Sequence, residues 1–450
     1  MNPSNEHQSR RFPNFEAAVQ SRLLPIALLA SILILFAALR VRAIWESTPA
    51  LFPDSYGYLA ISEFSLSNPE LYTGSRGFTV PLLYKLASSQ PQTILFLQVI
   101  LGVIAWGLLA LSTRKRISTT WLGYLSVVLI LAFALGRQVL IWDTAILSES
   151  ISMSLLALAL AIAFHLTNSS TKVTLAAFFL VTMLFAFARD SNAWLLGIGS
   201  LPVLASATIR RYRPHALPVG LLLLTISIIS IATSMLGQRG SLPLLNIYGQ
   251  RILPRPDRVE YFAELGMPLS VPLEGTAGEW ASTLASSQEP EIIKFTLWVR
   301  DEGLLTYARF LLTHPSVLFG EPLLNRDQLL AGGEYSFVLP DGFMSPPLWQ
   351  RLTDITYTKD LTLFILWVGT IFILAVNIAG WKHSVKRLAL PLLLLAISGP
   401  LAALVWHADA MEVERHATQV GIQFHLALWL ILLLSMDLAL TVNRSPTESL

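Results

Sequence analysis

Long apolar runs separated by short polar stretches dominate the amino-acid sequence. A helix needs about 20 apolar residues to cross the hydrocarbon of a bilayer, and inside it satisfies its own backbone hydrogen bonds. By this measure we expect about ten membrane-spanning helices, at residues 23–45, 92–112, 118–136, 147–166, 172–188, 191–209, 217–237, 360–380, 387–406 and 418–441. The pattern predicts an all-α polytopic membrane protein.

The polar stretches divide the chain into three parts. These are an N-terminal transmembrane module at 1–237, a long segment between the seventh and eighth spans at 238–359, and the C-terminal transmembrane helices at 360–450. The first part includes a polar loop, residues 46–90, directly after the first span. A Pro-Asp-Ser helix-start signal lies in this loop, so we expect it to carry short juxtamembrane helices.

Basic residues indicate how the chain is oriented. They cluster before the first span and after the second, sixth and eighth spans: Arg10, Arg11 and Arg22; Arg114, Lys115 and Arg116; Arg210, Arg211 and Arg213; Lys382, Lys386 and Arg387. All four clusters fall on one face if both termini are cytoplasmic, as the positive-inside rule requires. We therefore expect a multi-pass protein of the cell membrane whose loop 46–90 and segment 238–359 are outside, and an active site on that outer face.

The amino-acid composition excludes several kinds of reaction and substrate. Of the 450 residues 54% are hydrophobic and 13% charged, the formal net charge is +2, and there is no cysteine. The missing thiols exclude disulfides, a thiolate nucleophile and Cys-ligated metal, and the sequence has no basic tail for nucleic acid. It also contains neither a P-loop nor a dinucleotide-binding glycine pattern. A substrate already in the membrane is therefore a better candidate than a cytosolic nucleotide.

Asp54 is the first candidate for chemistry. It follows the first span closely and is flanked by Phe52, Tyr56 and Tyr58. A carboxylate beside hydrocarbon costs several kcal/mol unless it is paired or reaches water, so an acid held there is a functional candidate. The alternative is that Asp54 only caps the short helix that starts at Ser55.

The other outward turns carry acids and arginines as well. They hold Arg137, Asp143 and Glu149; Arg189 and Asp190; and Asp409, Glu412, Glu414, Arg415 and His416. Glu149 also fits a helix-terminus carboxylate that complements the helix dipole. Arg189 and Asp190 fit a pair that anchors the end of a span.

These residue types suit the transfer of a group from a phosphate-bearing lipid. A guanidinium makes bidentate bonds to phosphate oxygens, and the arginines at the expected headgroup level are Arg76, Arg137, Arg189, Arg251, Arg255 and Arg415. Displacing phosphate from a sugar carbon needs a base on the acceptor hydroxyl, which we assign to Asp54. Glu149 or Asp143 would stabilise an oxocarbenium-like transition state or hold Mg²⁺ or Mn²⁺. No ligand spacing is diagnostic of a metal, so metal dependence stays open.

Several stretches resemble a known superfamily. PDSYGYLAISEF followed by TGSRGFTVPLLYKL resembles the first outer loop of GT-C glycosyltransferases, membrane enzymes that use polyprenyl-phosphate sugars. The resemblance implies that Asp54 is the catalytic base, and TAILSESISMSLLALALA is similar to a recurring Leu-Ser-Glu of the superfamily, here Leu147, Ser148 and Glu149. LPLLNIYGQRILPRPDRVEYFAELGMP, FLLTHPSVLFGEPL and EVERHATQ resemble predicted actinobacterial members. Arg76-Gly77-Phe78 stands where better-known members have Arg-Pro-Pro, and Asp54-Ser55 argues against branches with two adjacent acids.

The resemblance implies a sugar transfer with inversion. The donor is a sugar on a polyprenyl-phosphate carrier, the acceptor is a glycan, a lipid or a protein, and Tyr58, Asp143 and His416 join the arginines in binding substrate. A transporter or lipid flippase, whose intramembrane charges line a pathway, is the alternative function. A non-catalytic scaffold is a third.

The long segment 238–359 mixes prolines with amphipathic stretches at 292–310 and 311–319. We expect a partly ordered lid whose helices lie on the membrane surface, and no separate soluble domain. In the functional alternative the segment roofs the site and selects the acceptor, with Asn246, Arg251, Tyr261, His314 and Glu321 as candidate contacts.

Overall fold

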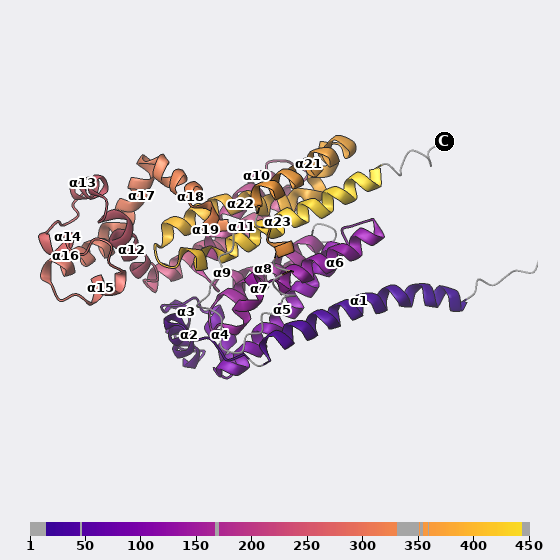
Figure 1. The fold of residues 1–450 in the computed structure, drawn as a ribbon, viewed down its shortest axis with the longest axis horizontal. Coiled ribbons are helices and arrows are strands. Elements are labelled where there is room, and N and C mark those ends of the chain that lie inside the picture. The colour runs from indigo at the N-terminus through magenta and orange to yellow at the C-terminus, as the bar shows by residue number, and fades with distance from the viewer. Residues whose placement is uncertain are drawn as a thin grey trace, which may run out of the picture.

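The computed structural model describes residues 15–45, 47–166, 171–330, 351, 354–358 and 360–442. Within these ranges the regular structure is helical, apart from an isolated parallel bridge between Ala50 and Ala145. Seven helices are long and apolar enough to cross a membrane, or eight if a bent pair counts as one span. The prediction of an all-α polytopic membrane protein is thus confirmed at this level, and Figure 1 shows the long helices packed side by side.

The seven long helices include both ends of the described chain. They are α1 (Phe15–Ile44), α5 (Pro91–Arg114), α8 (Glu149–Leu166), α11 (Arg213–Leu236), α21 (Leu361–Ala379), α22 (Trp381–Ala408) and α23 (Val413–Val442). Burial differs strongly among them, because only 11% of the apolar window of α1 is buried, against 67% for α8 and α23. Helix α1 thus lies at the edge of the bundle, whereas α8 and α23 lie in its interior (Figure 1).

Three further predicted spans are shorter helices. Helix α6 (Thr120–Leu135) is followed, after a bend of 53°, by α7 (Arg137–Leu140) and a 3₁₀ turn, η1 (Ile141–Thr144). Helices α9 (Lys172–Ala186) and α10 (Asp190–Ser206) have 15 and 17 residues. At 1.5 Å per residue they are shorter than the roughly 30 Å of hydrocarbon. Helix α9 packs on α8, and α10 packs on α11 and α22.

Polar side chains join the interior helices. Gln419 of α23 donates from Nε2 to Asn192 Oδ1 (2.6 Å), Asn192 donates from Nδ2 to Ser152 Oγ (2.7 Å), and Ser152 donates to Gln419 Oε1 (2.5 Å). This closed ring links α8, α10 and α23, and it satisfies polar groups that would otherwise be buried without partners. At the other end of α23, Arg387 pairs with Asp437 (2.7 Å) and bonds the carbonyl oxygen of Arg116. Two of the basic clusters predicted to share a face therefore lie at one end of the bundle.

The loop after the first span carries short helices, as predicted. They are α2 (Pro53–Glu63), α3 (Glu70–Thr73) and α4 (Thr79–Leu86), and α2 packs on α4. Ala50 N donates to the oxygen of Thr144 (2.8 Å), and Ile146 N donates to the oxygen of Ala50 (3.0 Å). These two bonds fix the entrance of the loop against the connection between η1 and α8.

The described part of the segment between α11 and α21 is folded around a core of its own. Its elements are α12 (Ser241–Ile247), η2 (Tyr248–Ile252), α13 (Pro256–Glu264), α14 (Val271–Glu274), α15 (Ala281–Ser286), α16 (Pro290–Trp298), η3 (Val299–Gly303), α17 (Leu304–Thr313), η4 (Ser316–Gly320), α18 (Glu321–Leu324) and α19 (Arg326–Leu330). Buried Tyr248, Phe262, Phe295 and Phe310 form the centre of this core. We call residues 241–324 the outer subdomain, because they lie beyond one end of the helix bundle (Figure 1).

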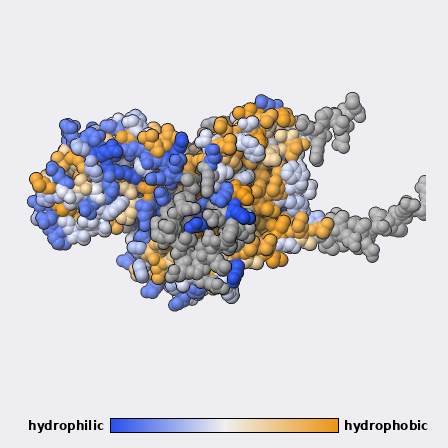
Figure 2. All heavy atoms as spheres, viewed as in Figure 1, coloured by the Kyte–Doolittle hydropathy of each residue, from blue (hydrophilic) through white to orange (hydrophobic). Residues whose placement is uncertain are grey.

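The outer subdomain has a hydrophobic core of its own, which was not predicted from the sequence. The apolar faces of its short helices converge on Tyr248, whose ring meets those of Phe262 and Phe295 edge-on. Figure 1 shows the subdomain beyond one end of the helix bundle. In Figure 2 hydrophilic residues are common on its surface, whereas hydrophobic residues predominate on the bundle.

Candidate functional site

Asp54 lies in the first turn of α2 and faces two arginines. Its Oδ1 is 2.7 Å from Arg76 Nη2, and its Oδ2 is 2.7 Å from Arg415 Nη2. The start of α2 is held by another side chain, since Phe52 N donates to Ser55 Oγ (2.9 Å). The capping role considered for Asp54 is therefore taken by Ser55, and the Asp54 carboxylate is used for ion pairing.

Arg76 reaches Asp54 because the loop approaches the backbone of another turn closely. A Cβ on Gly77 would lie 2.2 Å from the carbonyl oxygen of Phe187, so only glycine fits at that contact. The guanidinium of Arg76 also lies over the ring of Tyr58, 5.3 Å from its centroid. Burial raises the pKa of Tyr58, so its phenol is neutral at physiological pH.

Arg415 is the centre of the arrangement. It lies near the start of α23 and is buried, and its Nε is 3.0 Å from Glu412 Oε2 and 3.7 Å from Glu149 Oε1. Together with Asp54, these contacts bring the first outer loop, α8 and α23 to one point. A guanidinium has five donors in a rigid fork and suits such a shared position better than an ammonium group would.

Glu149 and Arg189 form a second, buried pair. Glu149 begins α8, and its Oε1 is 2.9 Å from Arg189 Nη1. The predicted pairing of Arg189 with Asp190 is wrong, because Asp190 pairs with Arg239 (3.2 Å). Arg189 has an extended backbone (φ −150°, ψ 144°) directly before α10, which sends the two neighbouring side chains in different directions.

His416 connects this pair to the outer subdomain. Its Nδ1 is 3.3 Å from Arg189 Nη2, and its Nε2 is 3.6 Å from Asp409 Oδ2. Asn246 of the outer subdomain donates from Nδ2 to Asp409 Oδ1 (3.0 Å). A continuous set of polar contacts therefore runs from Asp54 to the outer subdomain.

We call Asp54, Arg76, Glu149, Arg189, Arg415 and His416 the outer charge cluster. Burial alone would raise the pKa of Asp54, but the positive charges of Arg76 and Arg415 outweigh that effect and lower it. Asp54 is thus ionised at neutral pH. Three guanidiniums at one end of a membrane bundle also provide the donors that an anionic group needs.

Arg251 has a different position from the one predicted. It stacks on Trp406, with its Cζ 4.1 Å from the ring centroid, bonds the carbonyl oxygen of Trp406, and donates from Nη2 to the oxygen of Asp409 (3.3 Å). Its guanidinium thus joins the outer subdomain to the end of α22. These contacts are with Trp406 and Asp409 and not with the ion pairs of Asp54, and phosphate binding by Arg251 stays a prediction.

Asp143 is also outside the cluster. It is fully buried, and its carboxylate bonds Arg40 Nε (2.7 Å) and Nη2 (3.0 Å) and accepts from Ser150 Oγ (2.6 Å). The bend after α6 turns η1 into the core, so Asp143 does not face outward as predicted. Arg40 was missed, although an arginine within an apolar span signals a buried partner. Arg137 begins α7, and other arginines make the ion pairs of the outer charge cluster.

The remaining candidates of the outer subdomain hold it together. Glu321 pairs with Arg258 and accepts from Trp406 Nε1 (3.2 Å). The rings of Tyr261 and His314 meet edge-on in the subdomain, with their centroids 5.0 Å apart. None of the three is among the contacts of the outer charge cluster reported above.

The described residues do not assemble a metal site. No three His, Asp or Glu residues among them are grouped so that they could hold a metal ion. Asp54 and Glu149 face guanidiniums, which occupy the positions that a cation would take. These residues thus do not fit the Mg²⁺ or Mn²⁺ considered from the sequence.

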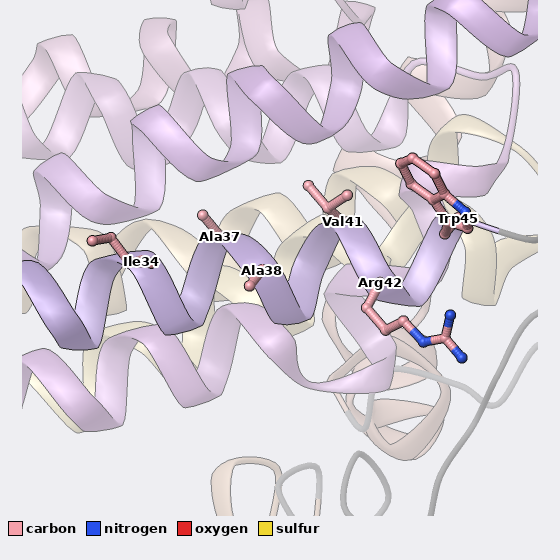
Figure 3. A pocket seen from close by; sticks show the side chains of 6 residues that line it. All are labelled: Ile34, Ala37, Ala38, Val41, Arg42 and Trp45. Carbon is pink, nitrogen blue, oxygen red and sulfur yellow. The ribbon is translucent and has the colours of Figure 1, made fainter.

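An open groove of about 560 Å³ runs along α1. It is lined by Ile34, Ala37, Ala38, Val41, Arg42 and Trp45, which Figure 3 shows along one stretch of the helix. The lining is mainly apolar and lies on the poorly buried helix at the edge of the bundle. No lining residue belongs to the outer charge cluster, so the groove is a separate feature.

The sequence matches no protein-family model, and a search of curated proteins found no significant match.

Proposed function

We propose that the protein is a membrane glycosyltransferase that moves a sugar from a polyprenyl-phosphate carrier to an acceptor on the non-cytoplasmic face. The supporting observation is the outer charge cluster, in which one partly exposed carboxylate, Asp54, lies between guanidiniums from two distant parts of the chain. The resemblance of the first outer loop to that of GT-C enzymes points to the same residue. This proposal includes the ten spans predicted from the sequence, with α6, α9 and α10 as short ones.

In this mechanism the acceptor hydroxyl oxygen attacks the anomeric carbon of the donor sugar. Its proton passes to the Asp54 carboxylate, and the bond between the anomeric carbon and the phosphate oxygen breaks. The electron pair of that bond leaves with the lipid phosphate. Because the hydroxyl attacks in one step from the face opposite the leaving phosphate, the configuration at the anomeric carbon inverts. Arg76, Arg189 and Arg415 compensate the charge that develops on the phosphate.

The ion pairs of Asp54 make its basicity depend on the donor. With both oxygens facing guanidiniums, Asp54 has a lowered pKa and is a weak base. A donor phosphate competes for Arg415, and as that guanidinium turns to the phosphate, Asp54 loses part of the attraction that lowers its pKa, so its proton affinity rises. Asp54 thus becomes an effective base only when the donor is bound, which limits transfer of the sugar to water.

Glu149 acts in this proposal mainly through the arginines. It is buried and contacts both Arg189 and Arg415. Removing it would leave the largely buried Arg189 guanidinium without its counter-charge, which is costly, and would leave Arg415 with Asp54 and Glu412 only. We therefore regard Glu149 as a positioning residue that also places negative charge near the developing oxocarbenium ion.

The test replaces Asp54 with Asn and measures transfer of radiolabelled sugar from polyprenyl phosphate in membranes. Asp301→Asn is the matched control, because Asp301 is an exposed carboxylate of the outer subdomain that pairs with Arg300. We expect transfer to be lost in D54N and kept in D301N at equal protein levels. Normal transfer by D54N would contradict the assignment of the base.

The alternative function is a transporter or lipid flippase, and one observation bears on it. The Ser152, Asn192 and Gln419 ring places polar groups between the interior helices, as a transport pathway would. These groups are bonded to one another, however, which also fits a purely structural role in helix packing. Uptake by proteoliposomes without sugar transfer would favour the transporter.

A further inference from the structure

The outer subdomain exposes large apolar side chains on the elements that lead back to the bundle. Leu305 and Leu312 of α17 are 74% and 78% exposed, Phe319 of η4 is 65% exposed, and Leu323 and Leu324 of α18 are 67% and 85% exposed. We call these five residues the apolar ridge. Scattered exposed leucines are common on proteins, but a run of such residues on consecutive elements marks a surface that binds an apolar partner.

Three contacts fix the position of the apolar ridge along the axis of the helix bundle. Tyr307 of α17 bonds His407 Nδ1 through its hydroxyl (2.9 Å), and His407 Nε2 donates to the oxygen of Leu318 (3.1 Å). Trp406 Nε1 donates to Glu321 Oε2 (3.2 Å). Trp406 and His407 are in the last turn of α22, at the end of an apolar span. The ridge therefore lies near the level where hydrocarbon gives way to headgroups.

We infer that the apolar ridge inserts into the bilayer leaflet at this end of the bundle. Helix α17 has one face on the protein and another apolar face free to meet lipid. Tyr307 and Phe310 are buried in the subdomain core, while Leu305 and Leu312 are exposed. Arg309 is exposed between these two leucines. An interfacial helix carries such a residue with its stem along the apolar surface and its charge among lipid phosphates.

The position of the ridge selects lipid over a protein partner. The part of the span ending at Trp406 and His407 that other helices leave uncovered has to face acyl chains, and η4 and α18 pack directly on that span. The ridge is therefore continuous with a surface that already faces lipid. This inference concerns how the outer subdomain is held and is independent of the proposed glycosyl transfer.

The absence of cysteine from the sequence allows a direct test. Single-cysteine variants Leu312→Cys and Leu324→Cys are spin-labelled in lipid nanodiscs, and collision rates with oxygen and with a water-soluble nickel chelate are compared. Leu363→Cys on α21 is the lipid reference, at 62% exposure. Val271→Cys on α14 is the water reference, at 81% exposure, and α14 lies far from the bundle in Figure 1.

We expect the ratio of oxygen to nickel collisions at positions 312 and 324 to be several-fold above that at 271 and close to that at 363. Adding Leu305→Lys to the Leu312→Cys variant should lower the ratio, whereas Val271→Lys should not. Ratios equal to that at 271 would overturn the inference. Dipolar broadening between labels of two copies, with few collisions of either kind, would also overturn it and identify a second copy as the partner.

Discussion

Arg415 Nη2 lies 2.7 Å from Asp54 Oδ2, although the two residues are 361 positions apart in the chain. The pair joins a short helix of the first outer loop to the first turn of the last described helix. Arg415 is buried and Asp54 is about one-third exposed. The carboxylate is thus accessible to solvent, while one of the two guanidiniums that lower its pKa is held by the bundle.

Replacing Arg415 should affect both stability and donor binding. In Arg415→Gln, among the described residues, Glu149 keeps only Arg189 as an ion-pair partner and Asp54 only Arg76. Breaking a buried ion pair from one side costs about 3–5 kcal/mol, which thermal unfolding in detergent would detect. Arg415→Lys should keep most of the stability and raise KM for the donor, because an ammonium group cannot bind phosphate through two parallel bonds. Unchanged KM in the lysine variant would contradict a phosphate contact by Arg415.

The pH at which activity is lost on the acid side of the pH–rate profile should depend on whether donor is bound. The pKa of Asp54 is lowered in the free protein by Arg76 and Arg415, so the acid limb of kcat/KM should lie below its ordinary value of 3.8. The profile of kcat reports the donor complex, in which Arg415 contacts phosphate, and its limb should lie at higher pH. If the acid limbs of the kcat/KM and kcat profiles fell at the same pH, this would contradict the exchange of Arg415 between Asp54 and phosphate.

The ion pairs of Asp54 should also make the stability of the folded protein depend on pH in the acid range. Because the pKa of Asp54 is lowered on folding, its contribution is present above the ordinary value of 3.8 and is lost as the pH falls through the lowered value. Wild-type protein should therefore lose stability below about pH 4 more steeply than Asp54→Asn, which lacks this titration. Thermal unfolding of both proteins between neutral pH and pH 3 measures the difference, and parallel curves would show that the pair adds nothing.

The buried pair of Arg40 and Asp143 should be structural. Arg40→Met leaves the Asp143 carboxylate without its bidentate partner, so we expect a loss of about 3–5 kcal/mol. Arg40→Met combined with Asp143→Leu should recover much of this loss, because neither residue then carries an unpaired charge. The double variant should also keep its KM for donor. A large rise in the KM for donor in a double variant of wild-type stability would show that Asp143 takes part in substrate binding.

Docking of the outer subdomain should depend on Arg251. Its stacking on Trp406 is typically worth about 0.5–2 kcal/mol, and Arg251→Met also removes the bonds to the oxygens of Trp406 and Asp409. Hydrogen exchange should become faster in α12 and at the end of α22, while α5 and α8 stay protected. Arg300→Met, at an exposed pair of the same subdomain, is the control. Uniformly unchanged exchange would show that other contacts hold the subdomain.

The membrane class and most of the helices could be predicted because they depend on local properties. An apolar run of sufficient length satisfies its backbone internally as a helix, whatever surrounds it. The seven long spans, the short helices after α1 and the polar residues at the span ends all follow from this rule. Helices α6, α9 and α10 are shorter than their apolar runs indicated, since a bend or turn ends each of them early.

The partners of the charged residues could not be predicted in the same way. Whether Arg189 meets Asp190 or Glu149 depends on the backbone angles before α10, and whether Asp143 faces outward depends on the bend after α6. The core around Tyr248 depends likewise on contacts between helices that are far apart in sequence. Hydropathy along the chain thus determined that this protein is a helical membrane protein with charged residues at the ends of its spans. Only the tertiary structure decided which charges meet, because ion pairs and core contacts depend on distance in space, which hydropathy does not record.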